Sequence, residues 1–289
     1  MTSDLHHLLA QWEADPSLLE PQSLRERCEV LDHLDVSISH ADPQPSSRHS
    51  SGTALHTRAL ALRSRLESVN SALCASIRSQ IRRGTRPAEL LHHLNPDKPA
   101  RPGLGYDFRD ELLSGILQLQ APEERSIAPE PEMVFYQPTP VRHILHLVAV
   151  AGLTQSDVLF DIGSGLGHVP LLISILTGIR CVGIEVNPAL VASARDCVRS
   201  LGLNRVAFIH QDARVADLSP GTLFYLYTPF TGALLRSVLE RLQIEAADHP
   251  IRIATLGPCT PIVASEPWLS ASSEPDPDRI SLFHSTWEH

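Results

Sequence analysis

Short apolar runs alternate with helical patterns between residues 158 and 256, and this alternation constrains the fold more than any other feature of the sequence. Buried parallel strands read as continuous apolar runs, and a crossover helix has to follow each strand before the next parallel one. The runs expected to form strands are Val158–Ile162, Arg180–Glu185, Val206–His210, Thr222–Tyr227 and Ile251–Leu256. The helices expected between them are Val169–Leu176, Pro188–Leu201 and Ala233–Leu242. The pattern predicts a Rossmann-like α/β domain with a doubly wound, mostly parallel sheet.

The end of the chain is expected to add a final pair of strands to this sheet. These are Pro261–Ser265 and Arg279–Ser285, on either side of a loop at Trp268–Asp278. Hydrophobic residues make up 43% of the chain but aromatic residues only 5%, so aliphatic side chains have to form most of the core.

Residues 1–125 have a different pattern of apolar residues, which predicts an α-helical N-terminal domain. Its longest expected helix, Thr53–Arg83, carries apolar residues at spacings of three and four, which places them on one face. These residues are Leu62, Leu66, Val69, Leu73, Ile77 and Ile81. The other expected helices are Asp4–Ala14, Leu24–Leu34, Pro87–Leu94 and Tyr106–Leu119, with a loop at His40–Gly52 and a proline-rich turn at Asn95–Gly103. Three roles stay open for this domain: a lid over a substrate cleft, an oligomerisation or partner surface, or simple packing.

A glycine-rich loop, Asp161–His168, follows the first expected strand directly and opens the next helix, which is the context that a ligand-binding glycine loop requires. Gly163 and Gly165 allow a tight turn and a close approach of a ligand to the backbone. A dinucleotide fingerprint, G-x-G-x-x-G, would need its third glycine where His168 stands. The third glycine is instead Gly167, so the run reads D-x-G-x-G-x-G and disfavours a nucleotide-linked oxidoreductase.

This run resembles the glycine loop of class I S-adenosylmethionine (AdoMet) dependent methyltransferases, and the resemblance covers about residues 134–256. Glu185 at the end of the second expected strand and Asp212 after the third fit the same family. The resemblance implies a seven-stranded sheet whose last strand is antiparallel, with AdoMet as the cofactor. It makes residues 126–289 an AdoMet-dependent methyltransferase domain.

The resemblance also implies which residues hold AdoMet. Asp161 is expected to contact the amino-acid part through its ammonium group, directly or through water. Glu185 is expected to accept hydrogen bonds from both ribose hydroxyls, and Asp212 from the adenine amino group. The cofactor-binding residues expected at this edge are Asp161, Gly163, Ser164, Gly165, Gly167, Glu185, Asp212 and Ala213. The alternative for Glu185 is a surface carboxylate, and the alternative for Asp212 is a helix N-cap.

A second motif, Val134–Pro140, precedes the glycine loop and looks like the Y-x-P-T-P entry of a methyltransferase group with protein-lysine members. The loop itself is similar to that of histone-lysine methyltransferases without a SET domain. By this resemblance, Tyr136 and Thr139 would cover the methionine end of AdoMet. The alternative is a proline-fixed turn before a helix.

The segment Tyr227–Phe230 stands where many amino-group methyltransferases carry D/N-P-P-F/Y. Pro229 and Phe230 fit that pattern, but Tyr227 replaces the Asp or Asn that would bind the amine. Tyr227 or Tyr136 is therefore expected to orient an acceptor amine as the catalytic residue. Thr228, Pro229 and Phe230 are expected to contact the substrate. Tyr225 and Tyr227 have the same parity on the strand and should face one side of the sheet, where core packing is the alternative.

Charge and composition exclude several classes of partner. The formal net charge of −9 and the pI of about 5.9 disfavour a nucleic-acid partner, which needs a basic surface. His143 and His146 lie three apart on an expected helix, but no carboxylate or cysteine stands at ligand spacing, so no metal is expected. The five scattered cysteines read as free thiols. No signal peptide or membrane-spanning run is found, so a cytoplasmic setting is expected.

The sequence thus predicts an AdoMet-dependent methyltransferase that acts on a protein side chain, such as a lysine-like amine, or on a small molecule. A catalytically inactive binding or scaffold protein with the same fold is the alternative. The intact glycine loop and Glu185 argue against that alternative, because an inactive site has no need of them. The oligomeric state stays open.

Overall fold

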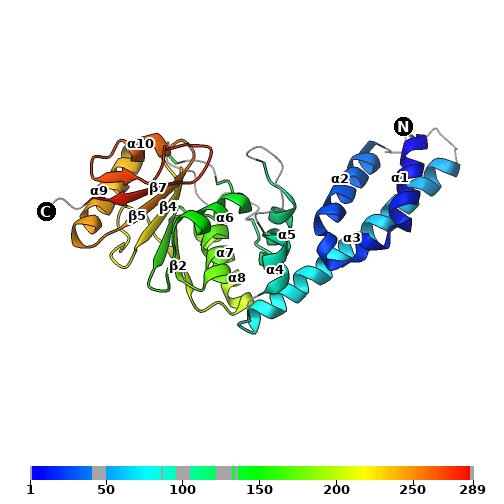
Figure 1. The fold of residues 1–289 in the computed structure, drawn as a ribbon, viewed down its shortest axis with the longest axis horizontal. Helices are drawn as coiled ribbons and strands as arrows, with labels where there is room; N and C mark the ends of the chain where they lie inside the picture. The colour runs from blue at the N-terminus through cyan, green and yellow to red at the C-terminus, as the bar shows by residue number, and fades with distance from the viewer. Residues whose placement is uncertain are drawn as a thin grey trace. The chain divides into compact units, whose positions relative to one another are not determined.

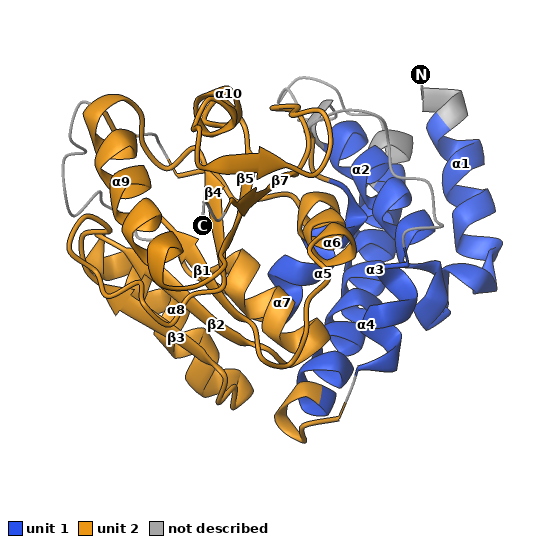
Figure 2. Ribbon diagram, turned by 60° about the vertical axis from the view of Figure 1, so that its left-hand side comes forward, with its two compact units in different colours: residues 1–80, 87–95, 107–116 blue, residues 81–86, 96–106, 117–289 orange. Residues whose placement is uncertain are grey.

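The computed structural model describes residues 2–40, 50–85, 87–95, 105–121, 132–133 and 136–286. The chain forms two compact units (Figure 2). Unit 1 comprises Met1–Gln80, Pro87–Asn95 and Asp107–Ile116, and unit 2 comprises Ile81–Arg86, Pro96–Tyr106 and Leu117–His289. The boundary predicted between residues 125 and 126 lies outside the described residues and stays a prediction.

Unit 1 is helical. Its helices are α1 (Thr2–Ala14), η1 (Pro16–Leu19), η2 (Pro21–Ser23), α2 (Leu24–His40), α3 (Ser50–Arg82), α4 (Ala88–His93) and α5 (Phe108–Leu117). A core of aliphatic side chains from α1, η1, α2 and α3 includes Leu9, Leu18, Val30, Leu34, Ala59, Leu62 and Leu66. Of the predicted apolar face of α3, Val69 is half-buried and the other members are buried.

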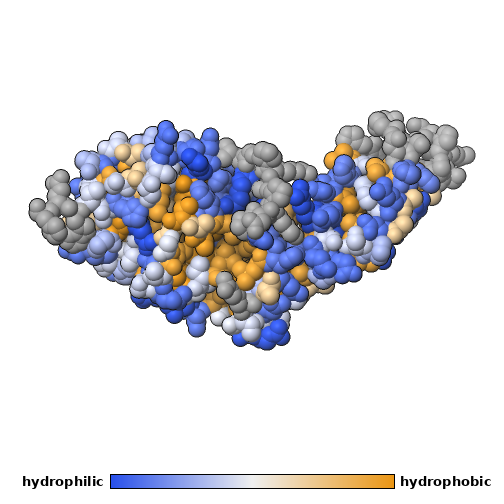
Figure 3. Space-filling model, viewed as in Figure 1, coloured by the Kyte–Doolittle hydropathy of each residue, from blue (hydrophilic) through white to orange (hydrophobic). Residues whose placement is uncertain are grey.

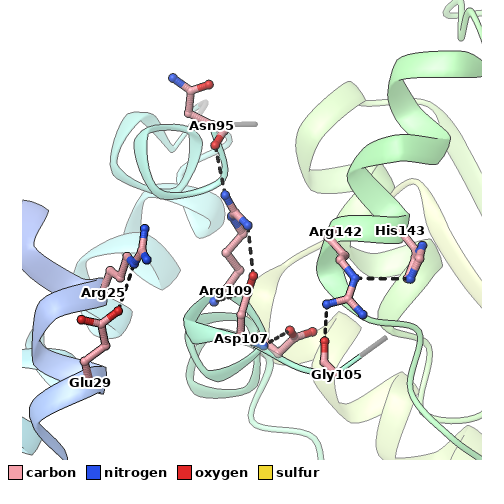
Figure 4. Close-up of polar contacts among 9 residues, drawn as sticks. Arg25, Glu29, Asn95, Gly105, Asp107, Arg109, Arg142 and His143 are labelled. Atoms are coloured by element: carbon pink, nitrogen blue, oxygen red, sulfur yellow. Dashed lines mark hydrogen bonds and ion pairs between the residues drawn. The ribbon is translucent and has the colours of Figure 1, made fainter. Parts of the chain in front are cut away.

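The structure changes the bounds of one predicted loop in the N-terminal part of the chain and describes only the first residue of a predicted turn. The predicted loop His40–Gly52 is shorter, because His40 ends α2 and Ser50–Gly52 belong to α3, while residues 41–49 lie outside the described part. Of the predicted turn Asn95–Gly103, only Asn95 is described. Its carbonyl accepts a hydrogen bond from Arg109 on α5 at 3.3 Å (Figure 4).

Unit 2 contains a seven-stranded sheet in the order β3-β2-β1-β4-β5-β7-β6. The strands are β1 (Val158–Ile162), β2 (Arg180–Glu185), β3 (Val206–His210), β4 (Leu223–Tyr227), β5 (Arg252–Leu256), β6 (Leu269–Ala271) and β7 (Ser281–Ser285). β1 to β5 pair in parallel, whereas β7 is antiparallel to both β5 and β6. The fold is the predicted Rossmann-like α/β sheet with an antiparallel last strand.

Helices cover both faces of this sheet (Figure 1). They are α6 (Val141–Val150), α7 (His168–Thr177), α8 (Pro188–Leu201), α9 (Gly232–Asp248) and α10 (Thr260–Ala264). The chain moves outward from β1 through α7 and α8 in one direction and from β4 through α9 in the other. Because crossovers between parallel strands are right-handed, α9 lies on the opposite face from α7 and α8. Apolar side chains also reach the surface over β2 and α7 on the face drawn in Figure 3.

One predicted strand is wrong. Pro261–Ser265 lies largely in helix α10, and the edge strand β6 lies within the predicted loop Trp268–Asp278. A short apolar run with β-branched residues is ambiguous between helix and strand. Pro261 decides it here, because a proline in the first turn has the backbone angle a helix needs and no N–H to lose.

The order of the strands creates one switch point, between β1 and β4. In the register of the sheet, Asp161 of β1 faces Gly183 of β2 on one side and Tyr225 of β4 on the other. The connections that leave β1 and β4 diverge to opposite faces, and ligands bind in the crevice that such a divergence opens at the carboxyl ends of the strands. No helix among the described residues is long and apolar enough to cross a membrane.

Candidate functional site

A cavity of about 230 Å³ opens at this switch point, within unit 2. The predicted site residues that line it are Tyr136, Thr139, Asp161, Gly163, Ser164, Glu185, Asp212, Ala213, Tyr227, Thr228, Pro229 and Phe230. Of the predicted residues, only Gly165 and Gly167 are not part of the lining. The structure therefore gathers nearly the whole predicted site, drawn from five separate segments of the chain, around one cavity.

The glycines of the loop have left-handed backbone angles, and protein side chains pack against them. At Gly163, with a φ of +76°, an added Cβ atom would lie 2.4 Å from the Cβ atom of Pro229. At Gly165, with a φ of +54°, it would lie 1.9 Å from the ring of Tyr136. Glycine is required at both positions, because any other residue would meet a strained angle and a steric clash.

Gly167 follows the same rule, since its φ is +86° and an added Cβ atom would lie 2.2 Å from the ring of Phe208 on β3. The loop is further fixed by its own backbone, because Gly163 and Ser164 both donate to the carbonyl of Ile184 at 2.9 Å. Backbone hydrogen bonds and side-chain packing thus hold the loop in place without a ligand.

Asp161 lies at the floor of the cavity with 5% of its surface exposed. Within the described part of the chain, its carboxylate forms no hydrogen bond or ion pair. Burial and the charge of Glu185 raise the pKa of Asp161 well above its ordinary value. The hydroxyl of Ser164 is likewise buried and finds no partner among the described residues. Buried charged groups are nearly always satisfied, so the carboxylate of Asp161 fits a cationic ligand group. The Oγ atom of Ser164 lies instead beside β2, 2.6 Å from the place that a Cβ atom would take at Gly183.

Glu185 differs from Asp161 because it is already hydrogen-bonded. One carboxylate oxygen accepts from the backbone N–H of Gly165 at 2.9 Å, and the other accepts from that of Asn187 at 2.8 Å. Each oxygen keeps a second lone pair that can accept from a ligand hydroxyl. The structure therefore presents Glu185 in a fixed orientation at the cavity wall.

Asp212 is ion-paired with Arg214, a residue that the sequence did not indicate. The two side chains approach to 2.5 Å, and the backbone N–H of Arg214 donates to the same carboxylate at 2.8 Å. These hydrogen bonds lower the pKa of Asp212. No helix begins at Asp212, so it is not an N-cap; its carboxylate instead closes a turn. Arg214 also lines the cavity, and nothing in the sequence pattern singled it out.

Tyr136 lies across the glycine loop. Its hydroxyl is 2.9 Å from Nδ1 of His168, the first residue of α7. Burial raises the pKa of the Tyr136 phenol above its ordinary value and lowers the pKa of His168 to about 4. The sequence indicated His168 only as the residue that interrupts a dinucleotide fingerprint. Val134 and Phe135 of the same motif lie outside the described residues.

Thr139 and Tyr225 form a second hydroxyl pair, 3.1 Å apart, beside Asp161. Tyr225 is 1% exposed, and burial raises its pKa well above the ordinary value. Tyr227 also lines the cavity and is half-buried, as its equal parity with Tyr225 predicts. The sequence analysis assigned no site role to Tyr225, although the same parity argument could have found it.

The segment after β4 is strained at Thr228. Its φ of 38° is unusual for a β-branched residue and persists only where surrounding contacts hold it. Here the hydroxyl donates to the carbonyl of Leu256 and accepts from the N–H of Cys259, both at 3.1 Å. The hydroxyl of Thr228 is therefore hydrogen-bonded to two backbone groups. The next residue, Pro229, lies close to Gly163.

Two segments distant in sequence border one end of the cavity. Met133 pairs with Phe230 in an antiparallel bridge, and the carbonyl of Glu132 accepts from the N–H of Thr231 at 2.9 Å. The Glu132 carboxylate accepts from the N–H of Leu234 at the start of α9, also at 2.9 Å. These contacts place the residues that lead to Tyr136 beside the segment that follows Tyr227.

A cation lies within electrostatic range of the cavity-lining Tyr227. The guanidinium of Arg142 on α6 donates to the carbonyl of Gly105 and to Nε2 of His143 (Figure 4). Its charge lowers the pKa of Tyr227, although burial has the larger, opposite effect. Burial also lowers the pKa of His143 to about 4. Among the described residues no three potential ligands gather at a metal site.

Comparisons with known proteins relate parts of this chain to methyltransferases. Residues 130–220 match the family of protein-L-isoaspartate(D-aspartate) O-methyltransferases. A stretch of 87 residues is 31% identical to the sterol 24-C-methyltransferase of Eremothecium gossypii, covering 30% of this chain and 23% of that enzyme. The chain thus spans less than a quarter of this relative.

Matches to solved structures cover about half of this chain and most of the other chain. An RNA methyltransferase from Salinibacter ruber in complex with S-adenosyl-L-homocysteine is 27% identical, with 52% of this chain and 92% of that chain covered and a TM-score of 0.41. A precorrin-6y C5,15-methyltransferase from Geobacter metallireducens is 15% identical, with 57% and 95% covered and a TM-score of 0.40.

Proposed function

We propose that unit 2 is an AdoMet-dependent methyltransferase domain and that the protein transfers a methyl group from AdoMet to a protein side chain or a small molecule. The match of residues 130–220 to a methyltransferase family supports this proposal. The observation that carries the proposal is the buried, unpartnered carboxylate of Asp161 at the switch point. An ammonium group is the ligand chemistry that satisfies such a carboxylate, and the amino-acid part of AdoMet supplies one.

The remaining lining fits the rest of the cofactor in strand order. Glu185 holds free lone pairs for two ribose hydroxyls, and Asp212 with the backbone of Ala213 borders the place for adenine. Ser164 lines the same cavity. The cofactor supplies a methyl group activated on a sulfonium, and this chain binds it, aligns it with the acceptor and excludes water.

For the acceptor, we propose a lysine-like amine on a protein side chain. Tyr136, Tyr225 and Tyr227 line the cavity, and their phenols are protonated near neutral pH because burial raises the pKa of each still further above neutrality. A phenol oxygen can accept an N–H of a neutral amine and direct its lone pair at the methyl group. Phe230 supplies an apolar wall. The charge balance of the chain disfavours a nucleic-acid acceptor.

A carboxylate acceptor is the second candidate, and a specific observation favours it. The family matched by residues 130–220 is described as an O-methyltransferase of isoaspartate, whose acceptor is a carboxyl group. Arg142 places a positive charge near Tyr227, which would attract a carboxylate and repel an ammonium. A small-molecule acceptor is compatible with either chemistry.

A labelling experiment tests the function and separates the acceptors. The full-length protein is incubated with methyl-labelled AdoMet and a cell-free protein extract, and the labelled products are divided into two portions. Mild alkali hydrolyses a methyl ester and releases methanol, whereas an N-methyl group is stable. Stable label on protein supports the amine, alkali-labile label supports the carboxylate, and label only in small molecules identifies that class.

The control for this experiment is Asp161→Asn, whose labelling should fall by about 10- to 100-fold at an AdoMet concentration below the Kd of the natural protein. AdoMet binding without transfer to any fraction would favour the inactive scaffold. We also propose a cytoplasmic setting, with which the five buried free cysteines agree. Unit 1 is proposed to provide the surface for a macromolecular acceptor or for oligomerisation.

A further inference from the structure

The contact between Tyr136 and His168 is not explained by the proposed chemistry. The two residues are 32 positions apart, yet the phenol oxygen lies 2.9 Å from Nδ1 of His168. His168 is the residue that begins α7 directly after the last glycine of the loop, and it lines the cavity together with Tyr136. A polar contact of this length between two cavity-lining side chains fixes the position of both.

The second contact of Tyr136 is with Gly165. The space that a Cβ atom would occupy at Gly165 is taken by the Tyr136 ring, at 1.9 Å. Gly165 does not line the cavity, so its lack of a side chain serves this ring and not the ligand directly. One edge of the Tyr136 ring therefore packs on the loop at Gly165, and His168 holds the hydroxyl of the same ring.

The direction of the hydrogen bond follows from the protonation of both groups. Burial keeps the Tyr136 phenol protonated, because it raises its pKa, and keeps His168 neutral, because it lowers its pKa to about 4. The phenol thus donates its proton to Nδ1 of His168, whose remaining proton is on Nε2.

We infer that His168 is a positioning residue, which holds Tyr136 across the glycine loop so that the phenol ring closes the methionine end of the cofactor cavity. This inference rests on the proposed function, because it concerns the same cavity. His168 acts through Tyr136 and not on the reacting atoms. Its loss should weaken cofactor binding by leaving Tyr136 free to rotate, with no large effect on the fold.

The test is a double-mutant cycle on AdoMet and S-adenosylhomocysteine binding to the full-length protein, measured by calorimetry. His168→Leu and Tyr136→Phe each remove one partner of a net hydrogen bond, so each should raise the Kd by about 3- to 10-fold. The double variant should be no weaker than the more affected single variant, since both changes remove the same contact. Melting temperatures are recorded for every variant.

A conservative variant distinguishes positioning from packing. In His168→Gln the side-chain amide oxygen can accept the phenol proton, so the Kd should return toward that of the natural protein. His284→Leu is the matched control, because His284 on β7 is bonded to Ser272 and does not line the cavity. Its Kd should be unchanged. If His168→Leu does not fold, His168→Gln and His168→Ser replace it, and only the glutamine variant should bind as tightly as the natural protein.

Each adverse outcome has a definite meaning. Natural protein that binds neither AdoMet nor S-adenosylhomocysteine would overturn the proposed function and this inference with it. Natural protein that binds both, with His168→Leu or Tyr136→Phe binding equally well, would overturn the inference and leave the function standing. Additive losses in the double variant would also overturn it, because His168 and Tyr136 would then act separately.

Discussion

The two units treat a buried charge in opposite ways. In unit 1, Arg27 is fully buried, and its guanidinium donates to Asn70 at 2.7 Å and to the carbonyls of Leu18, Glu20 and Pro21 at 3.0, 2.5 and 3.3 Å. In unit 2, Asp161 is almost as deeply buried, yet it has no donor in the described part of the chain. A buried charge with all its partners inside the protein stabilises the fold. A buried charge without partners indicates a place for a ligand.

The first test of this comparison is in unit 1, where we expect the largest loss of stability. Arg27→Met keeps the volume but leaves the carbonyls of Leu18, Glu20 and Pro21 without a donor. Four hydrogen bonds from a charged donor are lost, and the buried carbonyl of Leu18 is left unpaired, so the free energy of unfolding should fall by about 3 kcal/mol or more. Urea denaturation followed by circular dichroism measures it.

Arg63→Met is the control for Arg27→Met, because the ion pairs of Arg63 with Asp35 and Glu67 are exposed. It should cost less than about 1 kcal/mol. Equal effects of the two changes would show that the hydrogen bonds of Arg27 do not hold unit 1 together.

The glycine loop gives the next largest effect, and it should appear in binding as well as in stability. Gly163→Ala adds a Cβ atom 2.4 Å from Pro229 at a φ of +76°, so we expect AdoMet binding to be lost and the free energy of unfolding to fall by roughly 1–3 kcal/mol. Gly178→Ala is the matched control. Its φ of +75° is equally strained, but the nearest atom is 3.9 Å away. Calorimetry should show normal AdoMet binding for that variant, and a loss there would mean that backbone strain alone explains the result.

Asp161→Asn tests whether the charge of Asp161 serves ligand binding and not the stability of the fold. Removing the charge should raise the Kd for AdoMet by about 10- to 100-fold, since a hydrogen bond to a charged group contributes about 1.5–3 kcal/mol. The melting temperature of the ligand-free protein should stay equal or rise, because an unpaired buried charge is removed. Arg27→Met should do the reverse, lowering stability without changing the site. A lower melting temperature for Asp161→Asn would place Asp161 with the structural charges.

The smallest effect is a pH dependence. Burial raises the pKa of Asp161, so the folded protein holds this proton more tightly than the unfolded chain. Stability of the ligand-free protein should therefore fall as the pH rises from the ordinary aspartate pKa through the raised one. AdoMet affinity should rise over the same window, by at most about tenfold per pH unit, because the ammonium binds the ionised carboxylate. Calorimetry between pH 5 and 9 should show this rise in the natural protein and a flat profile in Asp161→Asn.

Much of the site could be predicted because its residues follow strand ends, which local sequence patterns mark well. β1, β2, β3 and α8 begin and end at the predicted residues. α8 shows why, since Asn187 caps its first turn and Gly202 follows its last residue in a left-handed conformation. The run Pro261–Ser265 was misjudged because strand and helix patterns are alike over so few residues.

The sequence by itself determined the five parallel strands of the sheet, the order of the polar residues along its edge and the class of cofactor, since these depend on neighbouring residues and on the direction of parallel strands. Only the tertiary structure decided which of those residues are satisfied. Asp212 is ion-paired with Arg214, Glu185 is held by two backbone N–H groups, and Asp161 has no partner in the described chain. Hydrogen bonds and steric contacts form between groups that packing brings together, such as Tyr136 and Gly165. A periodic pattern along the chain carries no information about them.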